Sequence, residues 1–452
     1  MKSIFLQILI SVFAISLLVA DEPLPIDSLW KSESFRKAYT GSYGIDSRIE
    51  PLINEDEAFY LGEAAKLMGK EDRPGAIQKL IDSDLLDNSP ALLFSLGNFH
   101  FEEGDPKVAI SYFDKALELF PNFRDAHRNV AMLKIQTGDH EAAEKHLKRA
   151  IELGSQEGLT YGLLAYCHTQ KNRLQAALSA YRMAQVTMPE EIQWQLGEAY
   201  TLQALDEAEK ASSIYASLIK KFPTDVSLWI NQANAYAQKE NYSEAIAHLE
   251  LANRMSDLNP QNRVVLGQMF LEQSLADLAV ENFREAVAEK GVSLSLAINC
   301  LGLLSNHQNW AEAKSFGEEC AGIYQEELAL PESKTFFSSF QRTMALAELE
   351  TGDAKAGAKR VETLLESDPL DGDALILLAR FREDNNQADD AIVLLEQAAI
   401  IPEKRAEALM AHGRILVSQF RYDEALKLLE ESQSLSPTAG LKAYIEAIEE
   451  LK

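Results

Sequence analysis

The sequence predicts an all-α solenoid in which helix hairpins of equal size stack in a row. Three observations predict it. Alanine recurs with a constant period of about 34 residues, apolar residues fall three or four apart within each period, and turn-forming residues separate the helices. One hairpin cannot bury its own apolar face, so each hairpin must pack against its neighbours.

The N-terminal segment 1–20 has the pattern of a secretory signal peptide. Lys2 supplies the positive start, Ile4–Val19 is apolar, and Ala20 precedes a polar change at Asp21. Leu18 is larger than the residue usually found two positions before a cleavage site, so an uncleaved anchor is the alternative. No later apolar run is long enough to span a bilayer. We expect a periplasmic or secreted protein, and the low cysteine content favours a bacterial periplasm.

Residues 21–56 form a leader before the repeats. The leader is rich in turn formers but carries four aromatic residues, Trp30, Phe35, Tyr39 and Tyr43. It either remains a loose extension or folds back onto the repeats.

A first block of repeats is predicted over residues 57–327. One column of the repeat is alanine, at Ala109, Ala143, Ala177, Ala211, Ala245, Ala279 and Ala313. A second column is nearly all small, at Gly97, Ala131, Ala165, Ala199, Ala233, Gly267 and Leu301. A third is mostly aromatic or leucine, at Phe113, Leu147, Tyr181, Tyr215, Leu249, Phe283 and Gly317. Small residues let two helices approach, and the large residue packs over that contact.

The repeat loses its phase at two places. At the start, Gly62 and Ala76 indicate a degenerate first hairpin in which the spacing slips. After Ala313 the phase is lost, and residues 328–337 are predicted as an insertion, either a lengthened helix or a loop. A second block follows over 338–440, with small residues at Ala345, Ala379, Gly413, Gly357, Ala391 and Ala425. Residues 441–452 are predicted as a solvating cap helix.

These columns resemble the tetratricopeptide repeat (TPR) family. The family signature is a small residue in the first helix, then alanine, an aromatic residue and alanine in the second, and a closing proline such as Pro121. The tryptophan that the family carries early in the first helix is present only at Trp229. The resemblance implies a right-handed superhelix of antiparallel hairpins, with a C-terminal cap helix.

Charge and cysteine content exclude several classes of function. The formal net charge of −27 disfavours binding to nucleic acid or to anionic lipid, because both attract basic surfaces. The acidic surface is interpreted as a solvating one, with a basic partner as the alternative. The three cysteines, Cys167, Cys300 and Cys320, have no metal-type spacing. Cys300 and Cys320 lie on inward columns of one hairpin, so they form either a disulfide or two buried thiols.

No catalytic motif is recognisable. The sequence lacks a phosphate-binding glycine loop and a nucleophile elbow. His140 and His146 are six residues apart, which places them on different faces of a helix, unlike the i, i+4 pair that binds zinc. The sequence therefore predicts no enzyme activity, no cofactor and no metal. An active site within the leader and first hairpin would require convergent polar residues there.

Partner binding is expected on the concave face. The TPR resemblance implies that first helices line this face, and their outward residues carry amide and aromatic groups suited to a peptide or a partner helix. The candidate contact residues are Phe94, Asn98, Phe101, Arg128, Met132, Tyr166, Gln170, Tyr200, Gln203, Asn234 and Gln238. Some of them, Phe94 above all, could instead pack against the next hairpin. The basic clamp by which some TPR proteins hold a C-terminal carboxylate lacks its lysine here.

The predicted function is a non-enzymatic protein-interaction scaffold in the bacterial cell envelope. The exported N-terminus, the Trp30–Pro51 leader and the stretch YGLLAYCHTQ resemble TPR proteins that accompany the TonB–ExbB–ExbD energy-transduction complex. That resemblance implies an inner-membrane-anchored partner. The alternative is an accessory or assembly factor for an envelope enzyme or a polysaccharide-export complex.

Overall fold

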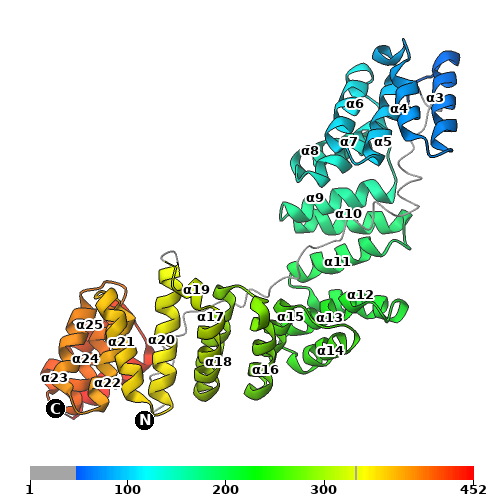
Figure 1. Ribbon diagram of the computed structural model, residues 1–452. Helices are drawn as coiled ribbons and strands as arrows, with labels where there is room; N and C mark the ends of the chain where they lie inside the picture. Colours follow the sequence, from blue (N-terminus) through cyan, green and yellow to red (C-terminus); the bar gives the residue numbers. More distant parts are fainter. Residues whose placement is uncertain (1–46, 331–332, 452) are drawn as a thin grey trace. The chain divides into compact units, whose positions relative to one another are not determined.

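The computed structural model describes residues 47–330 and 333–451 (Figure 1). The predicted signal peptide, 1–20, and leader residues 21–46 lie outside the described residues. The described chain is helical and contains no β-strand, which confirms the predicted all-α fold. None of its helices combines the length and apolar character needed to cross a membrane.

The chain divides into two compact units. The N-terminal unit ends at Asn241 and contains eleven α-helices among its described residues, with a 3-10 turn at Leu86–Asn88. Its α-helices are α3 (Glu55–Met68), α4 (Arg73–Ile81), α5 (Pro90–Glu102), α6 (Pro106–Leu119), α7 (Arg124–Gln136), α8 (His140–Glu152), α9 (Gly158–Gln170), α10 (Leu174–Thr187), α11 (Ile192–Ala204), α12 (Ala208–Lys221) and α13 (Val226–Gln238).

The C-terminal unit begins at Tyr242. It includes a 3-10 turn at Ala288–Lys290. Its α-helices are α14 (Tyr242–Met255), α15 (Pro260–Glu272), α16 (Ala276–Val287), α17 (Leu294–Asn306), α18 (Trp310–Ile323), α19 (Gln325–Leu328), α20 (Lys334–Glu350), α21 (Ala354–Ser367), α22 (Gly372–Asp384), α23 (Ala388–Ala399), α24 (Arg405–Ser418), α25 (Tyr422–Leu435) and α26 (Ala439–Glu449).

Within each unit the helices stack as successive hairpins (Figure 1). In the N-terminal unit α5 packs on α6, α7 on α8 and α9 on α10, and each hairpin contacts the next through α6·α7, α8·α9 and α10·α11. In the C-terminal unit the first helices of successive hairpins also touch, α20 with α22 and α22 with α24. This is the solenoid that the sequence predicts.

The alanine column forms the centre of each hairpin. All seven alanines from Ala109 to Ala313 have no exposed surface. A Cβ added to Gly97 would lie 2.5 Å from the ring of Phe113, and one added to Gly267 would lie 2.5 Å from the ring of Phe283. The small column and the aromatic column therefore meet as the spacing predicts.

The first hairpin, α3–α4, is regular where the sequence predicted a slipped one. Gly62 is exposed, and a Cβ there would meet nothing within 4 Å. The buried small residue is Ala64, twelve residues before the buried Ala76, which matches the spacing of Gly97 and Ala109. The assignment of Gly62 was wrong, because both Gly62 and Ala64 are small residues and only Ala64 keeps the regular spacing to Ala76.

The described end of the leader packs against α7. The main-chain carbonyl of Ile49 accepts a hydrogen bond from the N–H of Arg124 at 3.2 Å. The buried carboxylate of Glu50 lies 3.4 Å from Arg124 Nη2. α3 then begins at Glu55, where Asn54 and Glu57 form a capping box. This part of the leader folds onto the repeats.

The remaining boundaries shift by a few residues. The excess predicted at 328–337 is divided between the short helix α19 and a longer α20, which has 17 residues and begins at Lys334. The cap helix α26 begins at Ala439, because the side chain of Thr438 accepts the N–H of Leu441. Its buried residues Leu441, Ile445 and Ile448 join the core of the last hairpin. One face of α26 therefore packs on that hairpin and the other faces solvent.

Candidate functional site

All eleven predicted contact residues lie on first helices of the N-terminal unit, on α5, α7, α9, α11 and α13. The structure divides them by exposure. Four are buried and seven are half-buried or exposed. The buried four are Phe94, Asn98, Arg128 and Met132.

Phe94 and Met132 belong to the core. Neither has exposed surface. The Phe94 ring centroid lies 5.4 Å from that of Phe113 and 4.6 Å from that of Phe123. Their prediction as exposed contact residues was therefore wrong, because these positions pack against other parts of the stack.

Arg128 is also buried, and its charge is already paired. Its Nη1 lies 2.7 Å from Glu157 Oε2 and 3.6 Å from Asp125 Oδ1. The Asn129 amide donates to Asn98 Oδ1 at 2.9 Å, so the two amides satisfy each other in part. Arg128 and Asn98 thus stabilise the stacking of hairpins, and their prediction as open contact groups needs correction.

The other seven residues give a partly open surface. Gln170 is exposed, and the remaining six are half-buried. The Tyr215 hydroxyl donates to Gln203 Oε1 at 2.8 Å, and Gln238 Nε2 donates to the main-chain carbonyl of Gln203 at 2.8 Å. These bonds hold the two glutamines in defined positions. The partly open residues are Phe101, Tyr166, Gln170, Tyr200, Gln203, Asn234 and Gln238.

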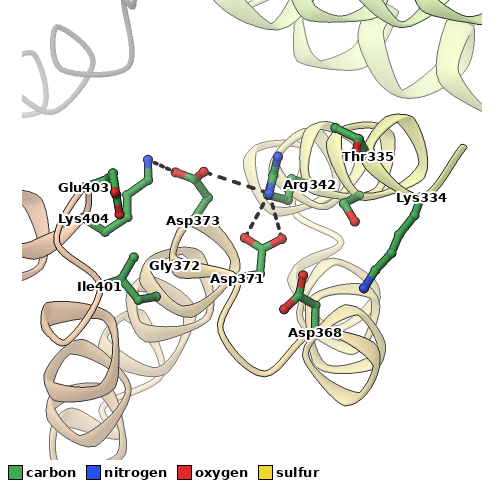
Figure 2. A pocket seen from close by; sticks show the side chains of 11 residues that line it. Lys334, Thr335, Arg342, Asp368, Asp371, Gly372, Asp373, Ile401, Glu403 and Lys404 are labelled. Carbon is green, nitrogen blue, oxygen red and sulfur yellow. Dashed lines mark hydrogen bonds and ion pairs between the residues drawn. The ribbon is translucent and has the colours of Figure 1, made fainter. Parts of the chain in front are cut away.

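The C-terminal unit contains a polar hollow of about 410 Å³ at the starts of three first helices (Figure 2). Figure 2 shows Lys334 and Glu403 at opposite sides of it. Both of these residues are exposed. The hollow is lined by Lys334, Thr335, Ser338, Arg342, Asp368, Asp371, Gly372, Asp373, Ile401, Glu403 and Lys404.

Ion pairs organise the hollow. Arg342 Nη1 donates to both carboxylate oxygens of Asp371, at 2.9 and 2.7 Å, and Lys404 pairs with Asp373. Asp371 Oδ1 also caps α22 by accepting the N–H of Ala374 at 3.0 Å. The hollow therefore offers both signs of charge, which suits a polar segment that carries both acidic and basic groups.

The 34-residue repeat matches models of a known protein family. Family models described as tetratricopeptide repeat match residues 100–165, 196–262, 342–405 and 406–438, which together make just over half of the chain. The chain belongs to the tetratricopeptide repeat family. TPR proteins generally serve as protein-interaction scaffolds, because stacked hairpins present an extended binding surface.

The curated relatives match this TPR chain over parts of their length. The TPR repeat-containing protein YpiA of Bacillus subtilis is 22% identical over 251 residues, which is 55% of each chain. The protein O-mannosyl-transferase TMTC1 of Homo sapiens is 22% identical over 212 residues, 45% of this chain and 24% of that protein. The chain thus spans from about a quarter to about half of these relatives.

Solved TPR structures share low identity with this chain. A tetratricopeptide repeat protein from Parabacteroides merdae has 18% identity and a TM-score of 0.39, and covers 56% of this chain and 98% of its own. YrrB, described as a TPR protein with an unusual peptide-binding site, has 18% identity and a TM-score of 0.38. Its match covers 41% of this chain and 95% of its own.

One group of described residues in this TPR chain has three potential metal ligands, at the end of α5. His100, Glu103 and Asp105 offer ligand atoms within 4.8 Å of one another. The His100 ring stacks on Tyr112, with a centroid distance of 5.3 Å and an interplanar angle of 9°. The two carboxylates are exposed, and the cluster is interpreted as part of a solvated turn.

The cysteines are free, buried thiols. Burial raises the pKa of Cys167 and of Cys320 to about 12, and it also raises the pKa of Cys300. All three thiols therefore stay protonated near neutral pH and are poor nucleophiles. The choice that the sequence left open between a disulfide and two thiols is answered in favour of thiols in this structure.

A histidine pair joins the two helices of the α7–α8 hairpin. His127 Nδ1 and His146 Nδ1 lie 2.9 Å apart, and His127 Nε2 lies 3.0 Å from the carbonyl of Pro121. Because a carbonyl only accepts, Nε2 of His127 carries a proton, and its Nδ1 accepts from His146. Burial and the neighbouring His127 lower the pKa of His146 to about 4. His140 instead contacts Tyr166, at a centroid distance of 5.6 Å.

The sequence missed Arg342 and the hollow. A signal was present, because Arg342 lies three residues before the small residue Ala345 just as Arg128 lies three before Ala131. Applying the candidate columns to the second block would have found it.

Proposed function

We propose that this chain is a non-catalytic scaffold that binds a peptide or a partner helix along the first helices of its N-terminal unit. One observation carries the proposal. Tyr166, Tyr200 and Asn234 occupy the same position of three successive repeats, on α9, α11 and α13, and all three side chains are half-buried. The same type of surface is thus offered by three successive hairpins.

The chemistry of these columns fits the proposed ligand. Asn and Gln amides donate to and accept from peptide groups, and tyrosine offers a flat amphipathic contact. Gln170 and Gln238 form a second column on α9 and α13. An amide does not transfer protons near neutral pH, which supports a binding role over a catalytic one. The transferase activity in the name of TMTC1 belongs to that protein, of which the match covers 24%.

We further propose that the protein acts in the bacterial cell envelope with a complex of the TonB–ExbB–ExbD type. The apolar stretch Ile4–Val19 after Lys2 supports export, and the leader and the YGLLAYCHTQ stretch support this class of partner. A scaffold anchored to such a complex needs no membrane span of its own once the signal peptide is removed.

The test is affinity capture of the full chain from envelope membranes in mild detergent. TonB-type components should co-purify with the wild-type chain, and the double variant Tyr166→Ala, Tyr200→Ala should capture less of them while its circular dichroism is unchanged. Equal capture by the variant would reject the proposed surface. Capture of polysaccharide-export components in place of TonB-type ones would support the alternative role in envelope assembly.

A further inference from the structure

Each hairpin turn contains one residue in the left-handed backbone region. In the described residues, eleven turns between consecutive helices have this feature, and the positions follow the repeat period through most of the chain. Ten of them carry glycine or a polar residue. The column is Glu71, Gly104, Gly138, Asn172, Asp206, Glu240, Ser274, Gln308, Gly352, Asn386 and Phe420.

Phe420 is the exception in this column. Its φ is 64°, in a region that disfavours bulky side chains because the Cβ approaches the following carbonyl. Its side chain is also the most exposed among the large apolar residues of the described chain, at 78%. A glycine would relieve the strain and remove the exposed apolar surface. A residue that carries both penalties at the surface is a candidate for function.

Phe420 lies next to an aromatic side chain and near several carboxylates. Its ring lies edge-on to Tyr422, with centroids 6.3 Å apart and planes at 84°. Arg421 Nη2 pairs with Glu424 Oε2 at 2.6 Å, and Asp389 acts electrostatically on the same guanidinium. Asp389 and Asp390 are exposed in the first turn of α23. The first turns of α23 and α25 carry four carboxylates, Asp389, Asp390, Asp423 and Glu424, against two cations, Arg421 and Lys427, so the local charge is negative.

An arginine or lysine side chain can contact both the aromatic rings and the carboxylates of this surface. Aromatic faces attract cations, and a guanidinium stacks on a ring while it pairs with a carboxylate. We propose that Phe420 and Tyr422 form a second docking surface, at the turn between α24 and α25, for an arginine-rich or lysine-rich segment of a partner protein. The surface lies on a hairpin turn of the C-terminal unit and is separate from the Tyr166, Tyr200 and Asn234 column.

The test compares Phe420→Gly with Asn386→Gly in the full chain. Asn386 occupies the same turn position one repeat earlier, so it is the matched control. The probe is a fluorescent peptide of alternating glycine and arginine, and the opposite-charge control is a peptide of alternating glycine and glutamate. Binding is measured by fluorescence anisotropy and stability by thermal melting.

Phe420→Gly should raise the melting temperature and weaken binding of the arginine peptide by about five-fold, a size typical of a lost cation–π contact. Asn386→Gly should leave binding unchanged, and the glutamate peptide should not bind. The proposal is overturned if the wild-type chain does not bind the arginine peptide. It is equally overturned if Phe420→Gly binds as tightly as wild type, which would indicate attraction by net charge alone.

Discussion

Arg128 in the N-terminal unit and Arg342 in the C-terminal unit occupy the same position of the repeat. Each pairs with a carboxylate 29 residues later, and each of those carboxylates, Glu157 and Asp371, is the N-cap residue of the next first helix. The Arg128 side chain is nevertheless 3% exposed, whereas that of Arg342 is 30% exposed and lines a hollow. Repeat position thus decides the partner, and the surrounding side chains decide whether the pair is open to a ligand.

The largest expected difference is in local stability. Arg128→Met removes a buried cation and leaves the buried carboxylate of Asp125 with one fewer partner, so the local free energy of opening should fall by about 2–3 kcal/mol. Arg342→Met should cost less, about 1–2 kcal/mol, because the Arg342 side chain is 30% exposed and the buried Asp371 keeps its cap on α22. Hydrogen exchange at the amides of α7 and α20 measures both. Equal losses would mean that exposure does not distinguish the two pairs.

A second comparison uses the glycine that follows each N-cap carboxylate. A Cβ at Gly158 would lie 2.6 Å from the main-chain oxygen of Ala184, which cannot move without shifting α10. A Cβ at Gly372 would lie 2.6 Å from Cγ of Lys404 and 3.1 Å from Cδ1 of Ile401, so these side chains must shift, but its three nearest atoms include none of the main chain. Gly158→Ala should therefore cost about 1–3 kcal/mol and Gly372→Ala less than about 1 kcal/mol.

Thermal melting of the two alanine variants measures this difference. Each variant is the control for the other, because the substitution and the repeat position are the same. A larger loss for Gly372→Ala would show that the hollow is more tightly packed than its lining indicates.

The smallest effect concerns pH in the α7–α8 hairpin that carries Arg128. Burial lowers the pKa of His127 below its usual 6.5, and burial with His127 lowers that of His146 to about 4. A lowered histidine pKa means that the unfolded chain binds protons more readily than the folded chain. The contribution of the two histidines to the free energy of unfolding is therefore fully present above pH 6.5 and is lost as the pH drops toward 4. Melting of wild type and His146→Phe across this range should show a weaker pH dependence in the variant. Identical pH profiles would contradict the role of the pair.

The period of the repeat made much of the fold predictable. Ala109 and its equivalents are buried as predicted, because a small residue at a helix crossing is a local requirement that repeats with the hairpin. The predicted helix boundaries were less accurate where a capping residue sets them. Thr438 caps the last helix, which therefore begins at Ala439, two residues before the predicted start. The left-handed position in each turn was overlooked, although Gly104 and Gly138 were a visible signal.

The candidate site was less predictable. Column position does not report burial, which depends on residues from neighbouring hairpins. Met132 and Tyr166 occupy the same column on first helices, yet Met132 has no exposed surface while Tyr166 is half-buried. The same cause separates Arg128 from Arg342. A single repeat seen in isolation contains no information on which of its outward residues the next repeat covers.

The most direct test of the account is site-specific photo-crosslinking in the full chain. A benzophenone amino acid at Gln170, exposed at the end of first helix α9, is compared with one at Val186, which is 74% exposed on second helix α10. In envelope membranes, adducts with a partner protein should form from position 170 and not from position 186. Adducts from position 186 alone would show that partners bind the second helices, and the proposed binding surface would be wrong.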